Sequence, residues 1–152
     1  MSDKRTEISK LSEMSEYEVM ARTIYGEARG EYARIDGGLA ALIAVGNVIL
    51  NRVHSRTWFG LTVQAVCLKP YQFSCWNVGD VNRLKLIQVP ESDALYALCL
   101  MVAKGLVNGQ IPDLTKGADH YYANHIQPPK WAINADERLR IGAHRFFKVP
   151  GR

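Results

Sequence analysis

Glu27 is the residue whose type and position are best suited to acid–base chemistry. It lies in a segment whose apolar residues recur at helical spacing, about 20° around the helix from Met20 and about 60° from Ile24. An apolar setting disfavours the ionised form of a carboxylate, so this side chain can keep a proton near neutral pH. That property suits general acid catalysis, including protonation of a glycosidic oxygen. Pairing with Arg22 or Arg29 at the edge of the stripe is the structural alternative.

Glu31 is a second carboxylate within one helical turn of Glu27. If the helix continued, the two side chains would lie on one face and could divide the acid and base roles. Gly30 comes between them and is a natural helix stop, so we expect Glu31 in a solvated loop.

A set of aromatic side chains clusters in two loop-rich segments. It comprises Tyr71, Phe73, Trp76, Tyr121, Tyr122 and Trp131. Flat rings at the rim of a cleft suit the apolar faces of sugars, although each ring taken singly is more often a core residue. Trp76 and Tyr122 are the preferred exceptions, because turn-forming residues flank Trp76 and polar residues flank Tyr122.

Polar side chains near these rings can bind sugar hydroxyl and acetamido groups. They are Tyr25, Gln72, Ser74, Asn77 and His120. Packing or the capping of turns is the structural alternative for each. Asn51 and Arg52 end a long apolar helix, where a cation suits the helix dipole, so a structural role is expected there.

The cysteines give no sign of a cross-linked or metal-bound framework. The sequence holds Cys67, Cys75 and Cys99. Their odd number and the lack of CxxC spacing favour three buried thiols. His120 and His125 are five residues apart and no HExxH motif occurs, so neither a metal nor another cofactor is expected.

Three long helices are expected to position the candidate residues. A capping box at Ser15 to Glu18 starts the first, which should reach about Arg29. The second follows residues 36–38, carries its apolar stripe from Leu39 to Val53 and should be central. Within that stripe, Gly46 would let another element approach closely. The third should run from residues 90–92 to residues 108–109.

Shorter elements complete the expected fold. A short helix is predicted from Thr62 to before Pro70, and residues 71–82 read as loop or short strand. Residues 119–123 and 143–149 read as strands around a turn at residues 128–129. We therefore expect an α+β domain over residues 15–152, mainly helical with a small β element, preceded by a polar arm over residues 1–14.

Composition restricts the classes of protein and partner. The chain has 152 residues, 47% hydrophobic and 22% charged, which excludes a disordered protein. Its net charge of +4 favours polyanions such as nucleic acid, acidic membrane or the bacterial wall. No nucleic-acid-binding motif supports the first of these. The longest apolar run, residues 39–50, is too short to span a bilayer.

Several ordered blocks make the sequence recognisable. They are residues 24–31 (IYGEARGE), 44–53 (AVGNVILNRV), 71–76 (YQFSCW), 119–123 (DHYYA), Trp131 and 141–148 (IGAHRFFK). Together they resemble the bacterial cell-wall hydrolases of the spore-cortex-lytic, SleB-like type, from about Ser15 to Lys148. Blocks in the same order make a specific match, whereas any one alone would be weak.

The resemblance implies a lysozyme-like, lytic-transglycosylase-like fold and cleavage of peptidoglycan between N-acetylmuramic acid and N-acetylglucosamine. It implies Glu27 as acid and then base, with the sugar's own hydroxyl attacking, so no second carboxylate is obligatory. The substrate-binding residues that we assign are Tyr25, Glu31, Gln72, Ser74, Trp76, His120, Tyr122 and Trp131. The expected partner is the peptidoglycan glycan strand, and the expected state is a monomer.

Three other functions stay open at this point. A hydrolytic muramidase would need a partner carboxylate for Glu27. A peptidoglycan amidase or peptidase would use Cys75 as nucleophile with His120 or His144. A non-catalytic module would bind the wall without cutting it.

The start of the sequence bears on where the protein would act. Residues 1–18 have mixed charge and lack the apolar stretch of a secretion signal. We therefore expect synthesis in the cytoplasm and action on the wall after the membrane is permeabilised, as in a phage endolysin. The basic surface would concentrate the protein on an anionic wall.

Overall fold

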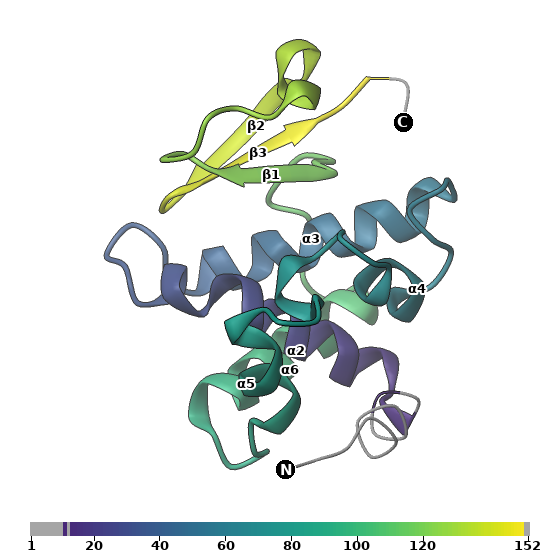
Figure 1. The fold of residues 1–152 in the computed structure, drawn as a ribbon, viewed down its shortest axis with the longest axis vertical. Helices are drawn as coiled ribbons and strands as arrows, with labels where there is room; N and C mark the ends of the chain where they lie inside the picture. The colour runs from purple at the N-terminus through teal and green to yellow at the C-terminus, as the bar shows by residue number, and fades with distance from the viewer. Residues whose placement is uncertain (1–10, 12, 151–152) are drawn as a thin grey trace.

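A helical body carries a small antiparallel sheet on one side (Figure 1). The structure is a computed structural model that describes residue 11 and residues 13–150. The helices are α2 (Glu16–Tyr32), α3 (Leu39–Ser55), α4 (Val63–Leu68), η1 (Ser74–Trp76), α5 (Val81–Gln88), α6 (Ala94–Val107) and η2 (Lys130–Asn134). The strands are β1 (His120–Ala123), β2 (Asp136–Ile141) and β3 (His144–Lys148). The mainly helical α+β class predicted from the sequence is confirmed.

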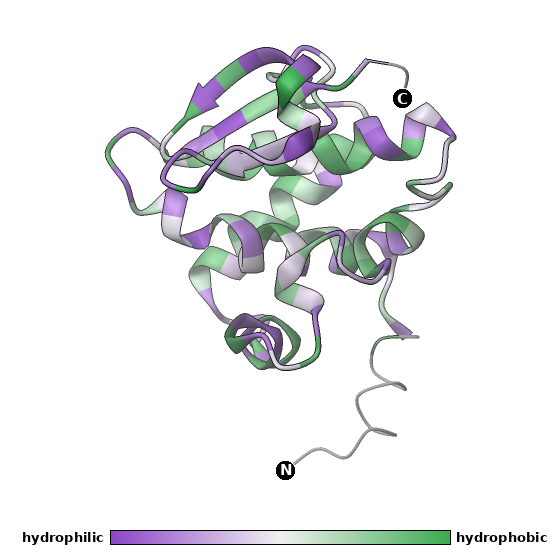
Figure 2. Cartoon of the chain, turned by 45° about the horizontal axis from the view of Figure 1, so that its top comes forward, coloured by the Kyte–Doolittle hydropathy of each residue, from purple (hydrophilic) through white to green (hydrophobic). Residues whose placement is uncertain are grey.

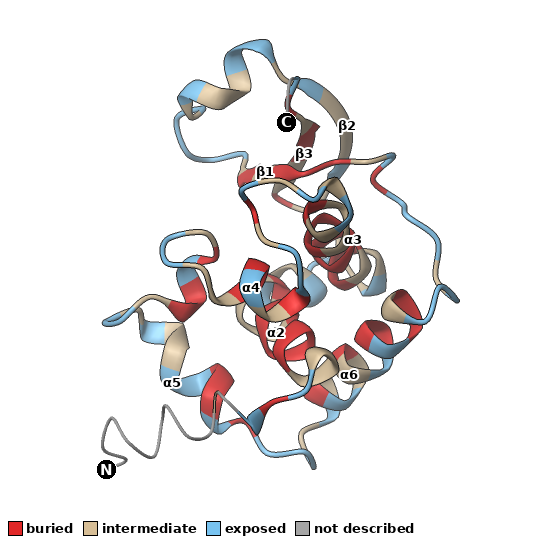
Figure 3. Ribbon diagram, turned by 90° about the vertical axis from the view of Figure 1, so that its right-hand side faces the viewer, coloured by how far each residue is buried: buried red, intermediate tan, exposed pale blue. Residues whose placement is uncertain are grey.

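Helix α2 is the buried centre of the helical body, as the burial colours of Figure 3 show. The predicted capping box is present, because Ser15 Oγ accepts from Glu18 N and the Glu18 carboxylate accepts from Ser15 N. The predicted stop at Gly30 is wrong, since the helix continues to Tyr32. A side chain at Gly30 would meet nothing within 4 Å, so this glycine serves neither close packing nor a turn.

Helix α3 lies between the other helices and the sheet (Figure 1). Its predicted position and apolar stripe are confirmed, and its C-cap is Arg56, a non-glycine residue at φ 53°. Gly46 allows the close approach that the sequence predicts, because a Cβ there would lie 2.3 Å from Leu106 Cδ1. Hydrophobic stretches accordingly gather on the central helices, and hydrophilic ones on the loops and the outer strand (Figure 2).

The sheet has the order β1-β3-β2, and both pairs are antiparallel. Tyr121 is the register partner of Phe146, and Ala123 of His144. Because side chains alternate across a strand, these residues share the inner face. Phe146 packs there with Ala44 and Val48 of α3 in a small core of its own. These contacts pack the sheet against α3.

Four elements were not predicted: η1, α5, η2 and β2. Helix α5 falls partly in the segment read as loop, and β2 carries the charged sequence DERLRI. The predicted helices at α4 and α6 are confirmed, with Thr62 and Asp93 as their side-chain caps. Most of the expected polar arm lies outside the described residues, and Met14, at its end, is buried in the main core.

Candidate active site

The Glu27 carboxylate lies where α2, η1 and β1 meet. The side chain is partly buried, and two other elements bind its two oxygens. Oε1 accepts a hydrogen bond from the hydroxyl of Tyr121, and Oε2 accepts one from the backbone N–H of Cys75 at 3.3 Å. No ion pair with Arg22 or Arg29 forms: Arg22 donates to carbonyl groups of α5 and the segment after it, and Arg29 donates to Asn82. Glu27 is therefore not held by the arginine pairing that was its structural alternative.

The short helix η1 approaches α2 at Gly26. A Cβ at this glycine would lie 2.8 Å from Cys75 Cβ and 2.8 Å from Leu86 Cδ2, closer than real side chains come. The missing side chain thus lets η1 and α5 pack directly on α2. This packing brings the Cys75 N–H to Glu27, the next residue along the helix.

Tyr121 closes the site from the sheet. Its ring lies 5.3 Å from that of Phe146 and 4.9 Å from that of His144, all on the inner face. Burial, followed by the charge of Glu27, raises the pKa of Tyr121 well above its ordinary value. The hydroxyl therefore keeps its proton at physiological pH and remains available as a hydrogen-bond donor.

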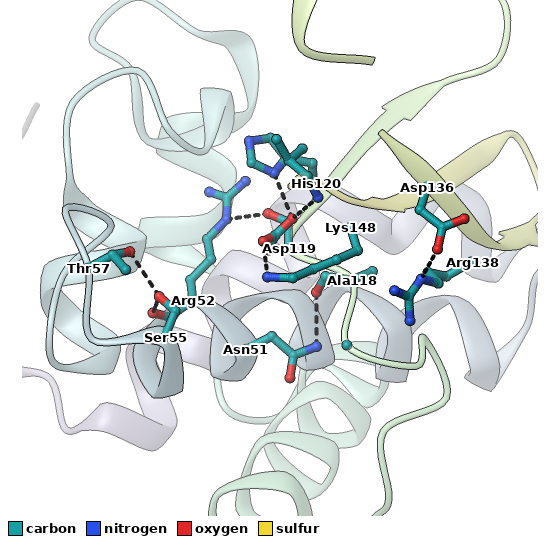
Figure 4. Close-up of polar contacts among 12 residues, drawn as sticks. Asn51, Arg52, Ser55, Thr57, Ala118, Asp119, His120, Asp136, Arg138 and Lys148 are labelled. Carbon is teal, nitrogen blue, oxygen red and sulfur yellow. Dashed lines mark hydrogen bonds and ion pairs between the residues drawn. The ribbon is translucent and has the colours of Figure 1, made fainter. Parts of the chain in front are cut away.

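Arg52 is a buried cation in the last turn of α3 (Figure 4). Its Nε donates to the carbonyl of Asp119 at 2.8 Å, and its guanidinium lies between the rings of Phe59 and Phe73. Burial lowers the pKa of Arg52, and Tyr121, Asp119 and Glu27 oppose that shift. The predicted structural role fits this geometry, because the side chain ties α3 to the start of β1.

Glu31 differs from its predicted position in a solvated loop. It lies in the last turn of α2 on the same face as Glu27, with a side chain only 15% exposed. Its Oε2 accepts from the backbone N–H of Ala143 at 2.7 Å, in the turn between β2 and β3, and lies 3.6 Å from Arg34 Nε. The prediction fails because the contact with this turn supports the extra helical turn that Gly30 alone would weaken.

Three of the predicted substrate-binding residues, Tyr25, Gln72 and Ser74, lie in α2 or in and just before η1. Tyr25 packs at the margin of the main core, with Arg29 stacked 5.2 Å over its ring. Ser74 is exposed at the start of η1, next to the N–H that binds Glu27, and Gln72 is half-buried in the preceding turn. Their sugar-binding roles stay predictions.

Trp76 is buried in the main core, with 6% of its surface exposed. Its indole N–H donates to Thr23 Oγ1 of α2 at 2.8 Å. One edge reaches a cavity of about 340 Å³ that is also lined by Tyr71 and Arg83. The ring holds η1 on α2, and its proposed contact with sugar stays a prediction.

His120, Tyr122 and Trp131 form a second cluster on the other face of β1 from Tyr121. The ring of Trp131 lies 4.6 Å from His120 and 5.7 Å from Tyr122, and Tyr122 stacks on Phe147 at 5.3 Å. His120 Nδ1 donates to the buried carboxylate of Asp119 at 2.9 Å (Figure 4). The structure therefore brings these three together but does not bring them into contact with Glu27.

Three groups at the site were not among the assigned residues: Tyr121, His144 and the backbone N–H of Cys75. The alternation of side chains along the predicted strand was the available signal for Tyr121, because it separates Tyr121 from Tyr122. The sequence does not say which face of the strand meets the helices, and no side-chain pattern identifies a backbone donor.

The thiol of Cys75 is poorly placed for the rival cysteine chemistry. The residue is fully buried, and burial together with the nearby Glu27 raises the pKa of its thiol. A reactive cysteine needs the opposite shift, because the thiolate is the nucleophile. Cys67 and Cys99 are also buried, as predicted, and burial raises the pKa of each to about 12.

The described residues contain neither a cluster of metal-binding side chains nor a membrane-spanning helix. Among them, no three His, Cys, Asp or Glu side chains gather in an arrangement that could hold a metal ion. None of the helices in that part of the chain is long and apolar enough to cross a membrane.

Comparison with known proteins gives the family of this helical domain with a small sheet. The chain belongs to the Cell Wall Hydrolase family, whose model matches residues 38–147. That match begins after Glu27 and does not cover this residue.

Relatives named spore cortex-lytic enzyme extend the similarity. The chain is 30% identical over 132 residues to the one from Halalkalibacterium halodurans, covering 87% of this chain and 34% of that protein. It is 29% identical over 146 residues to one from Bacillus cereus, covering 96% and 49%. The chain thus spans half or less of these relatives.

Two solved structures share the fold. The catalytic domain of Bacillus cereus SleB matches with a TM-score of 0.62 and 26% identity, covering 88% of this chain and 89% of that one. The catalytic domain of SleB from Bacillus anthracis, described as a germination-specific lytic transglycosylase, matches with a TM-score of 0.66 and 28% identity. That match covers 90% of this chain and 98% of the other. The predicted SleB-like family is confirmed.

Proposed function

We propose that this protein cleaves the bond between N-acetylmuramic acid and N-acetylglucosamine in peptidoglycan as a lytic transglycosylase, with Glu27 as the acid and then the base. The observation that carries the proposal is the pair of hydrogen bonds that hold the Glu27 carboxylate between β1 and η1. The relatives' names support the substrate, and the Bacillus anthracis structure's description supports the reaction.

In the first step, the proton of the Glu27 carboxyl group goes to the glycosidic oxygen as the bond from that oxygen to the sugar carbon breaks. In the second, the muramic sugar's own hydroxyl attacks that carbon and gives its proton to the Glu27 carboxylate. The product is an anhydro sugar, and no water is consumed. One carboxyl group that first loses and then regains a proton is therefore sufficient for both steps of the reaction.

Tyr121 is suited to support Glu27 in its roles as acid and as base. A hydroxyl group both donates and accepts hydrogen bonds, so it can hold the carboxyl group of Glu27 in either protonation state. The Cys75 N–H can only donate, and its bond to Oε2 fixes the orientation of the group. Together they keep the carboxyl group in one place while its proton moves.

A hydrolytic muramidase is the second candidate, and the position of Glu31 favours it. On one helix face, side chains four residues apart lie roughly 5–6 Å from each other at Cβ, within reach of a shared substrate. Glu31 Oε2 is already bound to Ala143 N, which reduces its freedom to activate water. We therefore rank this candidate below the transglycosylase.

Mass spectrometry of digested sacculi tests the proposal directly. A transglycosylase gives anhydromuramoyl ends, lighter by one water, or about 18 Da, than those of a hydrolase. The Glu27→Gln variant should lower the release of fragments at least roughly 100-fold, because it cannot supply the proton. Cys75→Ala should keep most of the activity. Hydrolytic ends that disappear in Glu31→Gln would establish the second candidate instead.

A further inference from the structure

His144 lies beside Tyr121 of the site described above. It begins β3 on the inner face of the sheet, with Ala123 and Ile141 as its register partners. Its ring lies 4.9 Å from the ring of Tyr121, whose hydroxyl binds Glu27. Tyr121 is therefore a neighbour of both His144 and the Glu27 carboxylate.

The imidazole of His144 has hydrogen-bonding capacity that the protein leaves unused. The residue is only half-buried, and within the described part of the chain neither ring nitrogen has a hydrogen-bond partner. Its protein neighbours are the rings of Tyr121 and Phe146. Both ring nitrogens are thus available to a ligand that lies beside Glu27.

Burial and nearby charges determine the protonation state of the His144 ring. Burial lowers its pKa, an effect that His125 increases and that the carboxylates of Glu31 and Glu27 oppose. At neutral pH the ring is therefore uncharged, with one nitrogen as donor and the other as acceptor. That pattern complements a neutral amide, which offers one N–H and one carbonyl oxygen.

We propose that His144 is a substrate-binding residue that hydrogen-bonds the N-acetyl amide of the sugar held beside Glu27. The proposal rests on the function proposed above, because it needs an N-acetylated glycan at this site. It gives the site a means to distinguish acetylated sugars from those whose amino group is free.

Binding to a protein that does not cleave tests the assignment. Calorimetric titration would compare Glu27→Gln alone with Glu27→Gln plus His144→Phe, using chitotetraose and its fully de-N-acetylated counterpart as probes. Phenylalanine keeps the stacking on Tyr121 but removes both polar atoms. We expect it to weaken the binding of chitotetraose about tenfold, the size of one lost hydrogen bond, and to leave the other probe unchanged.

Two further variants separate binding from folding. His144→Asn in the same background should recover part of the affinity, because its amide also donates and accepts. His54→Phe is the matched control, since His54 is an exposed histidine near the end of α3, and it should change neither titration. Thermal unfolding of each variant should agree with that of Glu27→Gln.

The assignment is overturned if His144→Phe binds chitotetraose as tightly as its parent, or loses both probes equally. It is also overturned if Glu27→Gln binds neither tetrasaccharide. The proposed function is tested separately, by whether the Glu27→Gln protein still digests sacculi. An active Glu27→Gln protein would refute the catalytic role while leaving the amide contact measurable.

Discussion

At the scale of single residues, the site depends on how one carboxyl group is held. Tyr121 donates to Glu27 from the sheet, and the raised pKa of Tyr121 keeps that donor protonated at neutral pH. A hydrogen bond to a charged group contributes roughly 1.5–3 kcal/mol. Removal of this hydroxyl group should therefore affect both catalysis and stability.

The Tyr121→Phe variant should digest sacculi roughly 10- to 100-fold more slowly, as measured by dye release, and calorimetry should show a thermal midpoint lower by roughly 3–12 °C. Tyr17→Phe is the matched control, because Tyr17 also donates to a side chain, Asn108, but far along α2 from Glu27. Equal activity of Tyr121→Phe and the unaltered protein would remove the hydroxyl group from the mechanism.

At the scale of elements, the two glycines in α2 differ in how much space surrounds them. Gly26 is where η1 and α5 touch the helix, whereas a side chain at Gly30 would have open space around it. Gly26→Ala should cost about 1–3 kcal/mol of stability through overpacking and should lower activity, because η1 carries the N–H that binds Glu27. Denaturant unfolding combined with dye release measures both effects.

Gly30→Ala provides the comparison within the same helix. Alanine favours a helix by up to about 1 kcal/mol over glycine, so this variant should be more stable and fully active. If Gly26→Ala behaved like Gly30→Ala, the close contact of η1 with α2 would not determine the geometry of the site.

The same elements show how far local patterns predict the fold. The capping box at Ser15 and the close approach at Gly46 were predictable because each depends on a short stretch of sequence and one neighbour. Helix α5 was not, because only Leu86 and Ile87 of its eight residues are buried, which leaves no clear stripe. Strand β2 was missed because its charged side chains form ion pairs on the sheet, as Glu137 does with Arg140 of β2 and Arg145 of β3.

The candidate site was predictable to the extent that it lies on one helix. Glu27 follows from its place in the apolar stripe of α2. Tyr121 and the Cys75 N–H reach it from segments 94 and 48 residues away, and their approach depends on tertiary packing. The choice of Tyr122 over Tyr121 failed to find the contact with Glu27 because only the packing of the sheet on α3 decides which face turns inward.

At the scale of the whole molecule, one buried residue, Asp119, links the strands of the sheet through its carboxylate and the sheet to α3 through its backbone carbonyl. The side chain of Asp119 is 1% exposed and accepts from His120 Nδ1, Lys148 Nζ and Val149 N (Figure 4). Its carbonyl accepts from Arg52. These donors lower the pKa of Asp119 to about 2, from an ordinary value of 3.8, against the opposing effect of burial.

This lowered pKa makes the stability of the sheet sensitive to acid. Because the folded protein binds the proton more weakly than the unfolded chain, the ionised carboxylate stabilises the fold above pH 3.8, by at most about 2 kcal/mol. That contribution should be lost as the pH falls from 3.8 towards about 2. Urea unfolding at a series of pH values should therefore show a decline in this range.

The Asp119→Asn variant tests this linkage. It should be less stable than the unaltered protein at pH 7, because Lys148 loses its anionic partner, and the difference should shrink as the pH approaches 2. Asp136→Asn is the control, since Asp136 forms an exposed ion pair with Arg138 and such pairs contribute little. A constant difference between Asp119→Asn and the unaltered protein across this range would mean that Asp119 acts through packing and not through its charge.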